Sequence, residues 1–205
     1  MDIIKISYID DNPDTTLSRY LDENYNRDQN NIKYKYEEFR FELTDNDEYK
    51  DFLNSDAILE YDIILIDSKL FQNSEEGERY TGDQIKIIIK NLYPFKELII
   101  ISQNDPINDY DDRIKKYSER NYNSAEAVEY YNKNLKPTIK KAINNILNHR
   151  NSFKEIYDAK IFDKALIDNL KDSIENTLPK YKELTNEKID EIIKSFNEIK
   201  EIIDK

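Results

Sequence analysis

Three short apolar runs constrain the fold more than any other feature of the sequence. The runs are residues 3–9 (IIKISYI), 61–67 (YDIILID) and 97–102 (ELIIIS). Their length and isoleucine content are typical of β-strands that are buried on both faces, as in parallel sheets. Polar residues stand where each run ends: Asp10 and Asp11 after the first, Asp67 in the second, and Ser102 in the third.

Segments with helical or alternating patterns separate these runs. Apolar residues at spacings of three and four predict helices, and alternation of apolar and polar residues predicts half-buried strands. The expected helices cover residues 15–26, 47–59 and 81–92, and a last one from Ser124 past Ile146 with a kink at Pro137. The further expected strands cover residues 32–43 and 113–120. Strands that alternate with helices predict an α/β fold, a doubly wound parallel sheet with helices on both faces.

The composition excludes several classes of function. A net charge of −12 disfavours nucleic acid and membrane surfaces as partners. The chain has no cysteine and one histidine, His149, so disulfides, zinc sites and cysteine nucleophiles are not expected. Two glycines are too few for a glycine-rich phosphate loop. Without an apolar stretch of membrane-spanning length or a signal peptide pattern, we expect a cytoplasmic protein.

The polar residues at the strand ends predict a metal site. In open parallel sheets, ligands bind at the carboxyl ends of the strands, where the strand order reverses. Asp10, Asp11, Asp67 and Ser102 would therefore gather at one edge. Carboxylates in close contact either take up a proton or bind a cation, and carboxylate oxygens suit Mg²⁺. A carboxylate beside such an ion can also attack a phosphoryl group.

Residues 1–149 resemble the receiver domain of bacterial two-component response regulators, in YIDDN, YDIILIDSKLF and LIIISQ. The resemblance implies a flavodoxin-like five-stranded sheet and a phosphoprotein that works in a phosphorelay. It implies that Asp67 accepts a phosphoryl group from a histidine kinase or phosphotransfer protein and that Ser102 assists. Mg²⁺ would be held by Asp11, Asp67 and the backbone carbonyl of Ser68, and oriented by Asp10. Such a domain signals and assists its own phosphorylation, and it is not a turnover enzyme. Gly82 also fits the family.

The family also places a lysine at the end of its last strand. Lys136 precedes a proline, as the family lysine usually does, but the residues before it read as a helix. Lys116 lies in the strand-like segment 113–120. We therefore favour Lys116, with Lys136 as the first alternative and Lys115 as the second. With Lys116, the helix before the last strand would be very short or absent.

Residues 150–205 form a separate helical extension in this reading. Isoleucines at helical spacing between Ile189 and Ile203 predict an amphipathic helix. The extension has more acidic than basic residues, so it favours a homodimer contact or an effector protein over DNA. A phosphorylation-independent adaptor is the alternative function. A magnesium-dependent phosphohydrolase fits less well, because Lys69 stands where such enzymes carry an aspartate.

Overall fold

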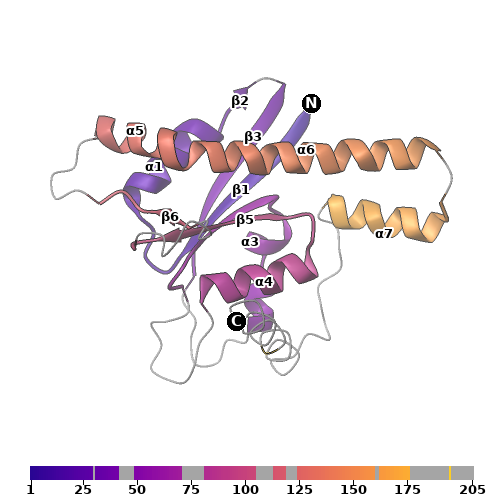
Figure 1. Ribbon diagram of the computed structural model, residues 1–205, viewed down its shortest axis with the longest axis horizontal. Coiled ribbons are helices and arrows are strands. Elements are labelled where there is room, and N and C mark those ends of the chain that lie inside the picture. The colour runs from indigo at the N-terminus through magenta and orange to yellow at the C-terminus, as the bar shows by residue number, and fades with distance from the viewer. Residues whose placement is uncertain are drawn as a thin grey trace, which may run out of the picture.

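The computed structural model describes residues 1–29, 31–41, 49–70, 81–104, 113–118, 124–159 and 162–175, together with Lys194. A curled sheet with the order β2-β3-β1-β4-β5-β6 lies at its centre (Figure 1). Its strands are β1 (Asp2–Asp10), β2 (Asp28–Gln29), β3 (Ile32–Arg40), β4 (Ile63–Asp67), β5 (Glu97–Ser102) and β6 (Ile114–Lys115). All neighbouring pairs are parallel except β2 with β3. The predicted flavodoxin-like α/β fold is thus confirmed, since its strand order is β3-β1-β4-β5-β6.

Helices cover both faces of the sheet. They are α1 (Thr15–Tyr25), α2 (Tyr49–Leu53), α3 (Asp56–Leu59), α4 (Gly82–Leu92), α5 (Ser124–Asn134), α6 (Lys136–Ala159) and α7 (Lys164–Ile174). Side chains from α2, α3 and α4 fill the core on one face, and side chains from α1, α5 and α6 fill it on the other. Figure 1 shows α5 and α6 running in line across the sheet, with α7 folded back beside α6. None of the described helices is long and apolar enough to cross a lipid bilayer.

Within the described residues, the structure differs from the predicted elements in several places. A sixth strand, β2, adds an antiparallel hairpin at the edge, with Asn31 in the left-handed region at φ 62°. The last strand is only two residues long. The helix expected over residues 47–59 is divided into α2 and α3. The last helix breaks at Leu135, so that Pro137 lies in the first turn of α6, where a missing N–H costs little.

The predicted boundary between residues 149 and 150 falls inside α6. Helix α7 packs against α6 through Ile167 and Ile174, which are both buried. The isoleucine stripe between Ile189 and Ile203 lies outside the described residues, apart from exposed Lys194. The segment before β6, where we expected a short or missing helix, also lies largely outside them. The division into two domains stays a prediction.

Candidate functional site

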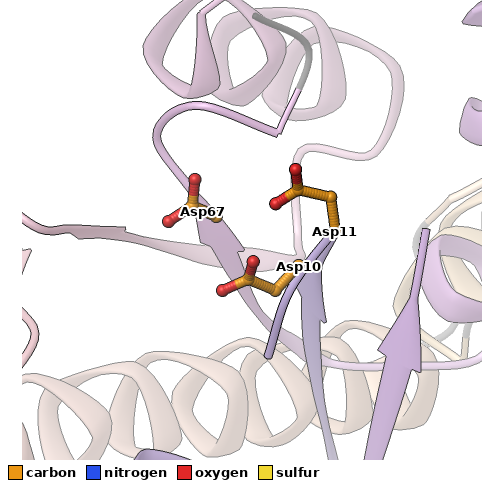
Figure 2. Close-up of side chains that lie close together, drawn as sticks. All are labelled: Asp10, Asp11 and Asp67. Atoms are coloured by element: carbon orange, nitrogen blue, oxygen red, sulfur yellow. The ribbon is translucent and has the colours of Figure 1, made fainter. Parts of the chain in front are cut away.

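Parallel register brings the acidic residues to one edge of the sheet. Ile9 pairs with Ile66, so Asp10 and Asp67 end neighbouring strands side by side. The carboxylates of Asp10, Asp11 and Asp67 each offer an oxygen within 4.8 Å of the others (Figure 2). After β1 the chain continues to β3 on one side of the sheet, and after β4 it continues to β5 on the other side. The strand order therefore reverses between β1 and β4, at the carboxyl ends that carry Asp10 and Asp67.

Lys116 follows β6 and reaches across to both strands. Its Nζ lies 2.7 Å from Asp10 Oδ2 and 2.8 Å from Asp67 Oδ1. The side chains of Asp10, Asp67 and Lys116 are all less than a tenth exposed. Among the residues that the structure describes, the ammonium that contacts these two carboxylates is that of Lys116. Lys136, by contrast, is exposed at the start of α6, and Lys115 uses its carbonyl to accept a hydrogen bond from Tyr130.

Hydrogen bonds occupy Asp10 on both oxygens. Its Oδ1 accepts the backbone N–H of Asn12 at 2.9 Å, and its Oδ2 accepts the Tyr8 hydroxyl as well as Lys116. Burial alone would raise the pKa of Asp10, but the hydrogen bonds from Lys116, Tyr8 and Asn12 outweigh it and lower that pKa. Asp10 is therefore held ionised and fixed in orientation.

Asp67 is in a different electrostatic state. Its Oδ1 faces Lys116 and its Oδ2 accepts the backbone N–H of Lys69 at 2.7 Å. Burial raises the pKa of Asp67, the neighbouring Asp10 charge adds to the rise, and Lys116 only partly offsets it. For Lys116 itself, burial acts to lower the pKa, but the hydrogen bonds to Asp10 and Asp67 outweigh burial and raise it. The lysine therefore stays charged between two carboxylates.

A cavity of about 240 Å³ opens above these groups. It is lined by Asp10, Asp11, Asn12, Asp67, Ser68, Lys69, Gln103 and Lys116. When all are ionised, the three carboxylates and the Lys116 ammonium together carry a charge of −2. The donor set at this cavity is oxygen-rich and has no histidine or cysteine, which suits a hard divalent cation such as Mg²⁺. Asp11 is the least buried of the three carboxylates.

Gly82 lies against the backbone of the residue after Asp67. A Cβ at Gly82 would stand 2.9 Å from Ser68 Cα and 3.1 Å from the Asp67 carbonyl oxygen, so a larger residue would displace this backbone. The Gly82 N–H donates to the Ser68 carbonyl at 3.1 Å. That hydrogen bond uses one lone pair of the carbonyl that we expected to face the metal, and its role as a metal ligand stays a prediction.

Ser102 is buried at the end of β5, next to the strand of Asp67. Its hydroxyl accepts the backbone N–H of Asn104 at 3.1 Å. The next residue, Gln103, lines the cavity, whereas Ser102 is not among the lining residues. The structure thus places Ser102 at the same edge, buried and next in the chain to the cavity-lining Gln103.

Sequence reasoning missed the part that Tyr8 plays. Its hydroxyl donates to Asp10 and accepts the backbone N–H of Asp14 at 3.3 Å. A signal was present, because residues two apart on a strand share a face, and Tyr8 lies two residues before Asp10.

Comparison with known proteins gives loose matches. No protein-family model matches this chain, and neither does any curated protein. Among solved structures, DrrB, an OmpR/PhoB-type response regulator of Thermotoga maritima, is 17% identical with a TM-score of 0.36. That match covers 62% of this chain and 50% of DrrB.

Two further solved structures belong to the same class. A two-component transcriptional regulator AraC from Clostridium phytofermentans is 18% identical with a TM-score of 0.38, over 73% of this chain and 98% of that one. The BeF3-activated receiver domain of DrrB is 17% identical with a TM-score of 0.34, over 65% and 98%. The chemistry of this chain has to be inferred from the residues of its own cavity.

Proposed function

We propose that this chain is a response-regulator receiver protein that accepts a phosphoryl group on Asp67. The observation that carries the proposal is the contact of Lys116 Nζ with Asp10 and Asp67 at a switch point of a parallel sheet. The donor would be a phosphohistidine on a histidine kinase or phosphotransfer protein. This role makes the chain a signalling domain that assists its own modification.

The acceptor chemistry uses the ionised form of Asp67. An ionised oxygen of Asp67 attacks the phosphorus, the bond from phosphorus to the histidine nitrogen breaks, and that nitrogen keeps the electron pair and takes up a proton. The product is an acyl phosphate on Asp67. Lys116 is charged, and its Nζ is already 2.8 Å from Asp67 Oδ1. It can therefore move its hydrogen bond onto a phosphoryl oxygen and stabilise the charge that develops there.

Mg²⁺ completes the proposed site. Asp11 and Asp67 would hold the ion, because Asp10 already accepts three hydrogen bonds and serves better to orient its neighbours. The carbonyl of Ser68 would contribute a further oxygen. When bound, Mg²⁺ neutralises the negative charge of the cluster and of the incoming phosphoryl group.

The output of the protein would be a protein contact. Residues 150–205 would pass the signal on through a homodimer or an effector protein, and not through DNA, given the acidic composition. Helix α6 leads directly from the sheet into this part of the chain, and α7 packs back on α6.

Phosphorylation by a small donor tests the proposal. The full chain is incubated with acetyl phosphate and Mg²⁺ and its mass is measured, for the wild type, Asp67→Asn and Asp62→Asn. Asp62 is a matched control, because it is a buried aspartate next to the other end of β4. We expect one phosphoryl group on the wild type and on Asp62→Asn, and none on Asp67→Asn. Equal phosphorylation of Asp67→Asn would refute the acceptor, and an unmodified wild type would favour the phosphorylation-independent adaptor.

A further inference from the structure

Strand β6 is short, yet it has to place the lysine of the site. It consists of Ile114 and Lys115 and is the outermost strand on its side of the sheet, and Lys116 follows it directly. On its inner side it pairs with β5, and the Lys116 N–H donates to the Ser102 carbonyl at 2.7 Å. An edge strand of this length has few ladder hydrogen bonds with which to hold Lys116 in place.

The outer side of this strand is bonded to two tyrosines. Backbone groups of successive residues in a strand point to opposite sides, so those of Lys115 and Tyr117 face away from β5. The Tyr130 hydroxyl donates to the Lys115 carbonyl at 3.0 Å. The Tyr131 hydroxyl accepts the Tyr117 N–H at 3.0 Å. The two hydroxyls thus stand where a further strand would otherwise bond, one on each side of Lys116.

Both tyrosines belong to α5, which is itself firmly packed. The ring of Tyr131 is fully buried and lies 5.2 Å from the ring of Tyr20 in α1. The ring centroids of Tyr130 and Tyr117 lie 5.6 Å apart with the rings tilted, and the Tyr117 hydroxyl donates to Glu126 at 3.2 Å. The rings remain in place if a hydroxyl is removed, so the hydroxyl contacts can be tested separately from the packing.

We infer that Tyr130 and Tyr131 are positioning residues for Lys116, which hold its backbone so that its Nζ reaches the acceptor carboxylate. This inference deepens the proposed function and rests on it for its biological meaning. A consequence is that α5 and the phosphorylation site are coupled: a shift of Lys116 toward a phosphoryl group pulls on α5. Coupling free energies are reciprocal, so a partner that displaces α5 also changes the affinity of the site for phosphate.

Removal of single hydroxyls tests this inference. The variants are Tyr130→Phe, Tyr131→Phe and the double variant, in the full chain. Tyr117→Phe is the matched control, because it removes a neighbouring hydroxyl and leaves the Tyr117 N–H bond to Tyr131 intact. Affinities are measured for Mg²⁺ alone and for beryllofluoride, an imitation of the phosphoryl group, in saturating Mg²⁺.

We expect a difference between the two affinities. Each Phe variant should bind beryllofluoride about fivefold more weakly, as the loss of one hydrogen bond allows. Mg²⁺ affinity should stay within about twofold, because Lys116 is not a metal ligand. Tyr117→Phe should match the wild type in both. Unchanged beryllofluoride affinity in the double variant, or an equal fall in both affinities, overturns the inference.

A second measurement separates the inference from the proposed function. The Lys116 N–H is hydrogen-bonded to Ser102, so its exchange with solvent reports how firmly this backbone is held, without any ligand. We expect faster exchange of the Lys116 amide in the Phe variants, with the core amides of β4 unchanged. If the wild type does not bind beryllofluoride but exchange still accelerates, only the proposed function fails. If exchange is the same as in the wild type, the positioning role fails.

Discussion

Two buried lysines at opposite edges of the sheet show how differently the same side chain can be used. Lys116 lies at the carboxyl edge, and its Nζ contacts two carboxylates. Lys96 precedes β5 at the amino edge, and its Nζ donates to the backbone carbonyls of Leu59 and Tyr61 at 2.9 and 2.8 Å. Burial lowers the pKa of Lys96 to about 7, with Asp62 opposing and Lys5 adding to the fall. The pKa of Lys116 is raised instead.

The aspartates at the two edges differ in the same way. Asp62 accepts the Lys5 N–H at 2.9 Å and Arg150 Nη2 at 2.8 Å. This arrangement ties α6 to the sheet. Asp67 has a second carboxylate beside it and a raised pKa, and it faces a cavity. The comparison indicates that charges at the amino edge are paired and stabilise the fold. At the carboxyl edge, buried carboxylates repel each other and shift the pKa of Asp67. Shifted pKa values of this kind are typical of binding and catalytic sites.

Removal of the Lys116 ammonium should have the largest effect on stability. We expect Lys116→Met to lower the free energy of unfolding at pH 7.5 by about 3 kcal/mol, because it leaves two buried carboxylates unpaired. The loss should shrink at pH 5, where a carboxylate without its cation takes up a proton more readily. Urea denaturation at the two pH values measures this. A loss of the same size at both would contradict the electrostatic explanation.

The amino edge should respond less, and without any change in ligand binding. Arg150→Met should lower the free energy of unfolding by about 2 kcal/mol, since it removes charged hydrogen bonds to Asp62 and to the Ile3 carbonyl. The beryllofluoride affinity should equal that of the wild type. A weaker affinity in this variant would mean that the two edges are not independent.

Lys96 should give the chain a pH dependence of its own. Its pKa is lowered in the folded state, so between about pH 7 and the ordinary lysine value the unfolded chain binds more protons than the folded one. Stability therefore rises with pH across this window, by at most about 1.4 kcal/mol per pH unit from this group. Lys96→Met should flatten the slope, as followed by denaturation from pH 7 to 9.5. A slope that is the same in the variant would assign it to other groups.

The smallest effect separates the two edges most clearly. The same Asp→Asn change should raise the stability of the chain at the carboxyl edge and lower it at the amino edge. Asp67→Asn should stabilise the ligand-free chain by about 1 kcal/mol, which raises the Tm by roughly 2–4 °C for a chain of this size. It removes a carboxylate whose pKa burial and Asp10 raise. Asp62→Asn should lower the Tm, because it weakens the bond to Arg150. Thermal denaturation in the absence of Mg²⁺ compares the two variants. A lower Tm for both would contradict the electrostatic difference between Asp67 and Asp62.

The sequence carried enough information to place the acidic residues. Two rules predict that Asp10, Asp11 and Asp67 lie close together. Continuous apolar runs form buried parallel strands, and the carboxyl ends of parallel strands meet at one edge of the sheet. Lys116 needed the resemblance as well, because the receiver family implies a lysine at the end of the last strand, and the strand-like segment 113–120 then favoured Lys116 over Lys136 and Lys115. The structure brings these residues together, while their roles in phosphoryl transfer stay predictions.

Other features could not be read from the sequence, for physical reasons. Strand β2 has two residues, too few for any periodicity. The break at Leu135 depends on how α5 and α6 pack on the sheet, and only the nearby Pro137 hinted at it. Tyr130 and Tyr131 were two among sixteen tyrosines, and nothing in their local pattern marked them as partners of a strand edge. Such contacts depend on tertiary packing.

Titration of the full chain with Mg²⁺ and then beryllofluoride, followed by amide spectra, shows whether the carboxyl edge is a phosphoryl-acceptor site centred on Asp67. The expected result is a set of shifts at Asp10, Asp11, Asp67, Ser102 and Lys116, with the amides of Asp62, Lys96 and Arg150 unmoved. Spectra in which neither ligand shifts the carboxyl edge, or in which both edges shift alike, would contradict it.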